Sequence, residues 1–340
     1  MPSPATMRPL PAGAGMLHEA AMIPEPAVRA QLPYALRQLD LPALGELYRG
    51  KVRDNYSRGD RIVMVTTDRV SAFDHVLGTI PFKGEVLSRL TSFWFDKVKD
   101  IAATHVLDTP DPSVMVVKRA KALPVEIVIR GYITGSLWRD YQAGKAGAYG
   151  IAWPAGLKKD QRFDEAVITP STKAEYGKHD EPISEAELLK QGLVAPEVWR
   201  EATAVAQRLF QRGQEWALGR GLILVDTKYE MGIAGGKLLV IDEIHTPDSS
   251  RYWVADGYGD RFARGVEQEM LDKENIRQWL IKEHGFSGQG KPPPLSEEVR
   301  IMLAMKYIEV FERLTGQKFE SEVGSVAGRI ERNLRAKGYL

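Results

Sequence analysis

The sequence predicts an α+β protein whose first third is a sheet-rich lobe. Two β-hairpins carry this prediction. Strands at 46–56 and 61–68 flank one turn signal, and strands at 222–232 and 237–244 flank a glycine-rich turn. Apolar residues recur at helical spacing in other segments, such as 201–221. The 340 residues are enough for one large domain or two smaller ones around a substantial core.

The composition excludes several kinds of chemistry. There is no cysteine, so disulfides, zinc–thiolate sites, iron–sulfur clusters and cysteine nucleophiles are ruled out. Lysine plus arginine number 46 against 45 acidic residues, a balance that disfavours nucleic acid or an acidic membrane as a partner. No apolar run approaches the roughly 18 residues of a membrane span. We therefore expect a soluble cytoplasmic protein, with an organelle transit peptide left open.

The first third divides into a tail and a compact part. Residues 1–35 are rich in alanine, proline and methionine, so we expect a flexible tail and a fold that begins near Leu36. A helix is predicted from Gly84 to Val98 by the spacing of its apolar residues. Two further strands are predicted at 113–120 and 125–132.

Long loops and helix caps mark the rest of the chain. Segments 143–160 and 168–184 are rich in glycine, proline and lysine, and loops of this length are more often functional than idle. Ser184 and Glu187 have the spacing of a capping box that starts a short helix. The C-terminal helix is expected to open at Ser296.

Acidic residues follow the two strands of the second hairpin. Asp226, Lys228 and Glu230 are two apart and so share one face of their strand, while Asp242 ends the next strand. Two carboxylates from adjacent strands would suit Mg²⁺ that bridges phosphate groups. The alternative is a solvated hairpin with its charges outward. The adjoining apolar runs LILV and LLVI favour a buried sheet that reaches a site.

A basic segment near the start of the fold could cover phosphate groups. In RGKVRD, Gly50 lets the backbone approach a ligand, and Lys51 and Arg53 alternate on one face of the predicted strand. The segment is not a Walker A loop, because the GK[ST] ending is absent. Taken alone, it is more often a solvated basic strand.

Arg130 is a candidate for binding a phosphomonoester. It follows an apolar strand, and Gly135 and Ser136 come shortly after it. A bidentate cation, a hydroxyl and exposed amides together can cradle a phosphate. The alternative, equally weighted, is a helix entry with Ser136 as its cap.

Two polar loops supply further candidates. Lys173 and Asp180 lie in the long loop before the capping box and are interpreted as ligand contacts. Asp248 and Arg251 follow the second hairpin in a run of hydroxyl and charged residues, which we expect to grip a polar, anionic small molecule.

Several segments in this order resemble the SAICAR synthetase family (phosphoribosylaminoimidazole-succinocarboxamide synthases). They are LYRGKVRD, TTDRVSAFD, VEIVIRGYITGSLW, PSTKAEYGKHDEPIS, LILVDTKYEMG and IDEIHTPDSSRYW, and the resemblance runs from about residue 40 to about 335. It implies an ATP- and Mg²⁺-dependent ligase of purine biosynthesis. The family condenses 4-carboxy-5-aminoimidazole ribonucleotide (CAIR) with L-aspartate to give SAICAR, ADP and phosphate, and we expect an acyl-phosphate intermediate.

The resemblance also implies an architecture. It implies two lobes, a smaller antiparallel-sheet lobe similar to a protein-kinase N-lobe and a larger α/β lobe, with ATP in the cleft between them. We assign residues 36–124 to the ATP-binding lobe and residues 125–340 to the substrate-binding lobe. We expect a monomer or a homodimer that binds only small molecules.

The resemblance carries roles onto individual positions. The implied nucleotide-binding residues are Gly50, Lys51, Arg53, Ala120, Glu230 and Asp242. Of these, Glu230 and Asp242 are also the implied Mg²⁺ ligands. The implied substrate-binding residues are Arg130, Ser136, Lys173, Asp180, Asp248 and Arg251. Lys228, Asp180 and Arg251 are expected to take part in catalysis. The group that accepts the proton of the aspartate amine is left open between Asp180 and a substrate phosphate oxygen.

Three other functions compete with this interpretation. A small-molecule kinase would share the ATP half of the reaction and release ADP without aspartate. A non-catalytic ATP-binding module would bind nucleotide without turnover. An RNA-binding protein is suggested by the basic strand with Tyr132 and Trp138, but the balanced charge disfavours it.

Overall fold

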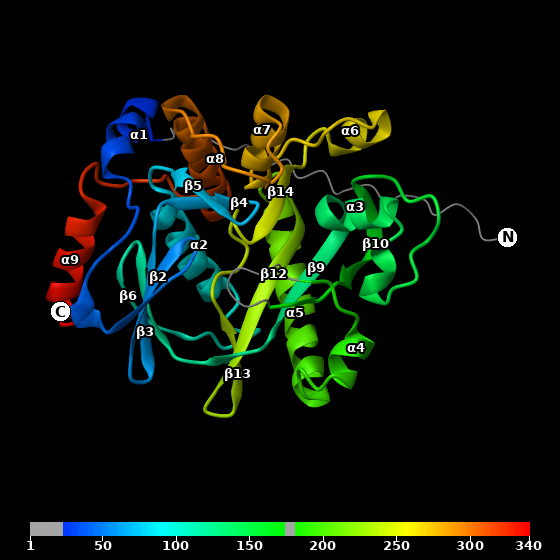
Figure 1. Cartoon of the computed structure of the whole chain (residues 1–340), viewed down its shortest axis with the longest axis horizontal. Helices are drawn as coiled ribbons and strands as arrows, with labels where there is room; N and C mark the ends of the chain where they lie inside the picture. Colours follow the sequence, from blue (N-terminus) through cyan, green and yellow to red (C-terminus); the bar gives the residue numbers. More distant parts are fainter. Residues whose placement is uncertain (1–22, 174–180) are drawn as a thin grey trace.

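The computed structural model describes residues 23–173 and 181–340, and it has an α+β fold (Figure 1). An antiparallel five-stranded sheet has the order β1-β2-β3-β7-β6. Its strands are β1 (Glu46–Arg49), β2 (Arg53–Arg58), β3 (Arg61–Thr66), β6 (Val106–Asp111) and β7 (Val114–Lys118). A small ribbon pairs β4 (Arg69–Ala72) with β5 (His75–Thr79).

The second sheet has seven strands and is centred on a long strand, β12. Its path is β10-β9-β12-β13, and three further strands pair with β9 or β12. The strands are β8 (Lys121–Ala122), β9 (Val125–Ile133), β10 (Gln161–Ile168), β11 (Ser171–Thr172), β12 (Leu222–Ala234), β13 (Lys237–Ile241) and β14 (Ser250–Val254).

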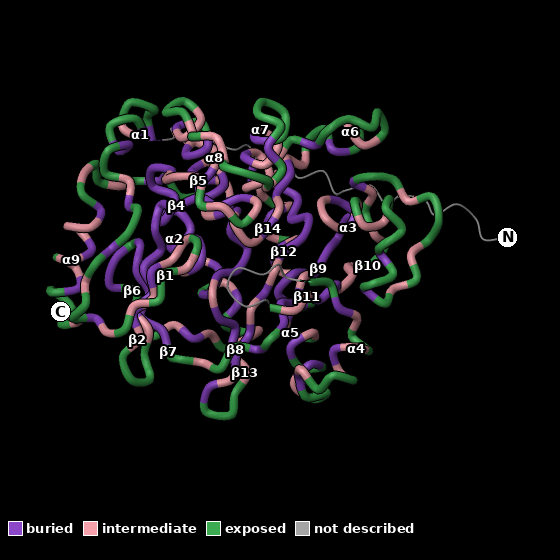
Figure 2. The backbone as a smooth tube through the Cα atoms, in the orientation of Figure 1, coloured by how far each residue is buried: buried purple, intermediate pink, exposed green. Residues whose placement is uncertain are grey.

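Helices surround both sheets. They are α1 (Glu25–Gln31), α2 (Lys83–Lys97), α3 (Gly135–Gln142), α4 (Glu185–Lys190), α5 (Pro196–Leu218), α6 (Tyr258–Arg264), α7 (Glu274–His284), α8 (Glu297–Thr315) and α9 (Val326–Ala336). The largest core includes buried residues of α2, α5, α8, β9 and β12 (Figure 2). In the described part of the chain, no helix is long and apolar enough to cross a membrane.

Helix α9 packs on the first sheet although it lies at the end of the chain. Ile330 and Leu334 share a core with Tyr56, Val65 and Val116 of that sheet. The predicted boundary assigns all residues after 124 to the larger lobe, and this division stays a prediction. It would separate α9 from the first sheet, on which α9 packs.

The expected start of the fold near Leu36 is wrong. Residues 25–31 form α1, in which Val28 is fully buried in the main core and packs near α8. Gln31 also donates a hydrogen bond to the carbonyl of Gly324 at 3.0 Å. The ordered chain thus extends well before the predicted boundary, and residues 1–22 of the expected tail lie outside the described residues.

The strand predicted at 46–56 is two strands. β1 and β2 pair antiparallel around a turn at 50–52, where the Gly50 amide donates to the Arg53 carbonyl at 2.8 Å. Lys51 therefore lies in the turn, and Arg53 begins the next strand. A period of two cannot show such a reversal, because the alternation continues in both arms of a hairpin.

Several local predictions are confirmed. A tight turn at Gly235 and Gly236, both with positive φ, joins β12 and β13. The Ser184 hydroxyl accepts the Glu187 amide at 3.1 Å, and Ser296 caps α8 in the same way. Helix α5 begins at Pro196, earlier than predicted, because proline at the first turn costs no hydrogen bond.

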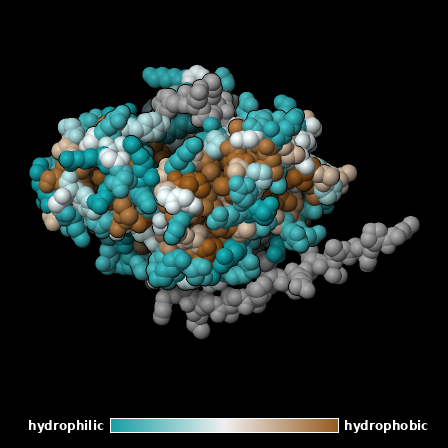
Figure 3. Space-filling view, turned by 90° about the horizontal axis from the view of Figure 1, so that it is seen from below, coloured by the Kyte–Doolittle hydropathy of each residue, from teal (hydrophilic) through white to brown (hydrophobic). Residues whose placement is uncertain are grey.

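One face of the molecule carries a group of apolar side chains. On the face seen from below, apolar side chains gather in the middle, between hydrophilic regions (Figure 3). A cavity of about 870 Å³, by contrast, is lined mainly by charged residues.

Candidate active site

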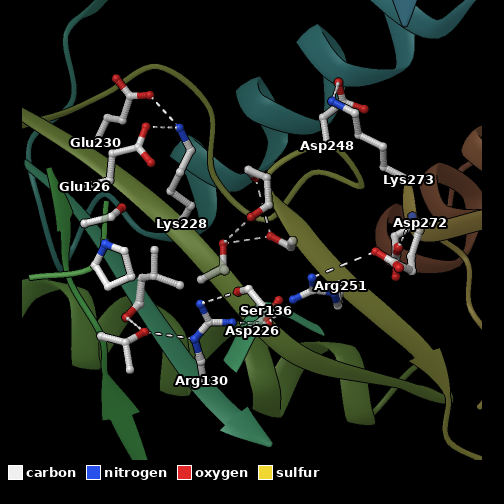
Figure 4. Close-up of a pocket in the computed structure, with 18 of the residues that line it drawn as sticks. Glu126, Arg130, Ser136, Asp226, Lys228, Glu230, Asp248, Arg251, Asp272 and Lys273 are labelled. Atoms are coloured by element: carbon white, nitrogen blue, oxygen red, sulfur yellow. Dashed lines mark hydrogen bonds and ion pairs between the residues drawn. The ribbon is translucent and has the colours of Figure 1, made fainter. Parts of the chain in front are cut away.

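A cavity of about 870 Å³ brings most of the predicted site residues together (Figure 4). Strands β9 and β12 form one wall, and the loop after β13, the start of α7 and the β1–β2 turn contribute the others. The predicted residues that line it are Lys51, Arg130, Ser136, Lys173, Lys228, Glu230, Asp248 and Arg251.

One cluster places a carboxylate between two arginines. Arg130 on β9 and Arg251 on β14 both lie opposite Asp226 of β12, so the three side chains share one face. Arg130 is 3.2 Å from Asp226, and Arg251 also forms an ion pair with it. Arg130 donates to the hydroxyls of Thr169 at 2.8 Å and Ser136 at 3.4 Å. The arginines are thus fixed in position, and both line the cavity.

The pKa values of both arginines reflect their burial. Burial lowers the pKa of Arg130, which Asp226 offsets in part. Burial also acts to lower the pKa of Arg251, but Asp226 and Glu274 outweigh it, so that pKa is raised. Gly135 has φ +57°, and a Cβ there would meet the Arg251 guanidinium at 2.3 Å. Glycine at this position therefore leaves the space that Arg251 occupies.

A second cluster joins two lysines and two glutamates. The Lys228 ammonium donates to Glu230 at 2.8 Å and to Glu126, and Lys173 pairs with the other oxygen of Glu230. Burial would lower the pKa of Lys228, but Glu230 and Glu126 outweigh it and raise the pKa. Burial would raise the pKa of Glu230, but Lys228 and Lys173 lower it to about 2. Lys228 and Glu230 are therefore both charged near neutral pH.

The end of β13 lies close to the first sheet. Asp242 follows β13 with φ +64° and forms an ion pair with Arg53 of β2. Arg53 is also 3.2 Å from Glu243. The register sets Glu230 opposite Ile241, the residue before Asp242. Neither Arg53 nor Asp242 lines the cavity in which Glu230 lies.

The described residues contain no ready-made metal cage. Over 23–173 and 181–340, no group of three or more histidine or acidic side chains is arranged to hold a metal ion. Mg²⁺ in nucleotide sites is commonly held by one or two carboxylates, substrate phosphates and water. Glu230, inside β12 rather than at its end, lies opposite Ile241 and so close along the ladder to Asp242, and two such carboxylates fit that smaller donor set. A metal role for them stays a prediction.

A third cluster surrounds Asp248. Its carboxylate accepts hydrogen bonds from Lys83 at 2.8 Å and from Tyr307 at 2.5 Å, and Lys273 lies 3.7 Å away. Burial would raise the pKa of Asp248, but Lys273 and Lys83 outweigh it and lower the pKa.

The other predicted residues that the structure describes lie at the edges of this arrangement. Lys51 lines the cavity and pairs with Asp74, while Gly50 makes the turn beside it. Ala120 lies in the connection between the sheets, near Gly232 of β12 and outside the cavity lining. Asp180 lies outside the described residues.

Sequence reasoning missed several charged residues of the cavity. Glu126 lies two positions from Val128 and four from Arg130 on β9, so the alternation of VEIVIR could have placed it on the Arg130 face. Lys273 and Arg277 carry no comparable signal, because their helix was not predicted.

Comparisons with known proteins identify the family of this chain. A family model described as SAICAR synthetase matches residues 46–293. A phosphoribosylaminoimidazole-succinocarboxamide synthase of Legionella pneumophila strain Lens is 44% identical over 311 residues, which are 89% of this chain and 99% of that protein.

Solved structures show the same fold. SAICAR synthase from Saccharomyces cerevisiae, complexed with SAICAR, is 32% identical with a TM-score of 0.73, covering 84% of this chain and 100% of that one. A SAICAR synthetase in complex with ADP is 23% identical with a TM-score of 0.62, covering 81% and 100%. From the match over 46–293 and the identity to the Legionella enzyme, the chain belongs to the SAICAR synthetase family.

Proposed function

We propose that the cavity is the active site in which the chain condenses CAIR with L-aspartate, driven by ATP, through an acyl phosphate. Membership of the SAICAR synthetase family makes the chain an enzyme of purine biosynthesis that forms SAICAR. The main support for placing the active site here is that the Arg130–Asp226–Arg251 cluster and the Lys228–Glu230 cluster line the same cavity.

The arginine cluster suits the phosphate of CAIR. Two guanidinium groups and the Ser136 hydroxyl converge at one wall, and a phosphomonoester needs several donors and positive charge. Asp226 holds both arginines in place before substrate arrives. Their rotamer freedom is therefore already restricted, which lowers the entropic cost of binding.

The ATP phosphates would lie beneath the β1–β2 turn. A protein of this fold binds ADP, and the turn carries Gly50 and Lys51 with Arg53 just after it. We place adenine near Ala120 between the two sheets, and Mg²⁺ on Glu230 and Asp242. When bound, Mg²⁺ supplies charge neutralisation on the phosphate oxygens. Lys173 and Asp180 would then contact substrates from the long loop.

The chemistry needs positioning more than a nucleophile. A carboxylate is a poor acyl donor, so an oxygen of the CAIR carboxylate attacks the γ-phosphorus of ATP and ADP leaves. The aspartate amine then attacks the acyl carbon, phosphate leaves, and the nitrogen loses a proton. Lys228 is held as an ammonium by Glu126 and Glu230, so it neutralises charge rather than acting as a base.

The test is ADP release from purified protein with MgATP, CAIR and L-aspartate, each omitted in turn. Release that requires all three, with SAICAR formed, supports the proposal. Release with CAIR but without aspartate would favour a kinase, and no release would favour a binding module. We place the reaction in the cytoplasm. The residues named for the site all come from one chain, so either a monomer or a homodimer could form it.

A further inference from the structure

A buried cluster at one wall of the cavity joins two lysines to a single carboxylate. Lys83, at the start of α2, donates to one oxygen of Asp248 at 2.8 Å, and Lys273 lies 3.7 Å from the same oxygen. Tyr307 on α8 donates to the other oxygen at 2.5 Å. Asp248 and Lys273 lie across the cavity from Glu126, Lys228 and Glu230 (Figure 4).

The cluster leaves a positive charge that faces the cavity. Two ammonium groups share one carboxylate, so one unit of positive charge is left over within the cluster. The Lys83 side chain is completely buried, whereas that of Lys273 is 17% exposed and lines the cavity. Arg277, one turn along α7, also lines the cavity but is paired with Glu274 at 3.1 Å. The excess charge therefore reaches the cavity through Lys273.

Both oxygens of Asp248 are already occupied. Its side chain is only 4% exposed, and Lys83 and Tyr307 each take one oxygen. A carboxylate that makes these contacts is a poor direct partner for a substrate. It is well suited to hold Lys273 in place, because an anion close to an ammonium restricts where that flexible side chain can lie.

We propose that Lys273 binds a carboxylate of L-aspartate, and that Lys83, Asp248 and Tyr307 are positioning residues that hold Lys273 at the cavity wall. The inference rests on the proposed function. If the CAIR phosphate lies on Arg130 and Arg251, its carboxylate must face ATP on the Lys228 side. The Lys273 side is then left for the third substrate.

The chemistry of aspartate agrees with this place. Its two carboxylates do not react, so a cation at the cavity wall can hold one of them throughout the reaction. Its amine must be neutral when it attacks, and a nearby fixed positive charge disfavours the ammonium form. Lys273 would thus bind the substrate and favour the reactive form of its amine. Asp248, predicted as a substrate contact, would act through Lys273.

The test measures the KM of each substrate with the other two saturating. We expect Lys273→Met to raise the KM for L-aspartate at least tenfold and to leave the KM values for CAIR and ATP within twofold. Lys273→Arg should recover part of the loss. Tyr307→Phe should raise the same KM about threefold, since it removes one hydrogen bond from Asp248. Tyr56→Phe is the matched control, because its buried hydroxyl bonds to Leu39 away from the cavity.

The other outcomes are decisive. Three results for Lys273→Met would overturn the inference and leave the proposed function standing. They are a rise in the KM for CAIR, an equal rise in the KM values for all three substrates, and no change in any KM. Absence of SAICAR formation by the unaltered protein would overturn the proposed function itself. If thermal unfolding shows that Lys273→Met does not fold, Tyr307→Phe and Lys273→Arg carry the test.

Discussion

Arg53 on β2 forms an ion pair with Asp242, the residue that follows β13, and so ties the first sheet to the second. The side chain of Arg53 is only 12% exposed and also contacts Glu243. Arg53 is the proposed phosphate ligand and Asp242 the proposed Mg²⁺ ligand. In this structure each is the counter-ion of the other. When MgATP binds, a phosphate would replace Asp242 as the partner of Arg53, and Mg²⁺ would replace Arg53 as the partner of Asp242. If these proposed roles hold, the pair would couple the contact between the sheets to nucleotide binding.

Removing the charge of Asp242 should abolish turnover while the fold survives. We expect Asp242→Asn to lower kcat at least 100-fold, because a neutral amide is a much weaker Mg²⁺ ligand. The melting temperature should change little, since Arg53 keeps its contact with Glu243. Asp260→Asn, on the exposed face of α6, is the control. Unchanged turnover across a Mg²⁺ titration would refute a metal role for Asp242.

Truncating Arg130 should weaken CAIR binding in particular. We expect Arg130→Ala to raise the KM for CAIR roughly 10- to 100-fold, about 1.4–2.7 kcal/mol of lost binding. Arg130→Lys should recover only part, because an ammonium cannot reproduce the fork of donors. Steady-state kinetics with each substrate varied would check this, with Arg264→Ala on α6 as the control. An effect confined to the KM for ATP would show that the phosphate lies elsewhere.

His245 should make stability depend on pH. It is fully buried, its Nε2 is 2.5 Å from the Tyr229 hydroxyl, and burial lowers its pKa to about 3. The unfolded chain binds the proton near pH 6.5, so the contribution of neutral His245 is present above that pH and is lost as pH falls from about 6.5 toward 3. The expected slope is about 1.4 kcal/mol per pH unit.

Urea unfolding of His245→Gln at pH 7, 6 and 5 would check this dependence. The variant keeps a polar partner for Tyr229 but does not titrate. We expect its stability curve to be flatter than that of the unaltered protein by the slope given above. His105, whose pKa burial lowers to about 4, contributes in both proteins and so cancels in the comparison. Parallel curves would contradict a buried neutral His245.

Helix α1 should contribute to stability although it lies before the predicted start of the fold. Val28→Ala removes two buried methyl groups and should cost about 2 kcal/mol of unfolding free energy. Ala30→Ser, at an exposed position of the same helix, is the control. Chemical denaturation would measure both variants. A loss below about 0.5 kcal/mol for Val28→Ala would show that α1 does not pack firmly in solution.

Local chemistry in the sequence determined many of the elements. The glycine pair between β12 and β13, the caps at Ser184 and Ser296, and the alternation in β9 each follow from neighbours a few residues apart. The same local signals pointed to Arg130 and Glu230, because charged residues that adjoin apolar strands stand at the edge of a core. Family resemblance supplied their roles.

Only the tertiary structure decided which distant residues meet. Lys83, Asp248, Lys273 and Tyr307 come from α2, the loop after β13, the start of α7 and α8, and no spacing in the sequence connects them. The same holds for α1, whose short, proline-containing segment gave no helical signal but packs near α8. Hydrophobic burial is non-directional, so the whole chain decides which helix covers which sheet. That packing in turn decides which charged side chains reach the cavity.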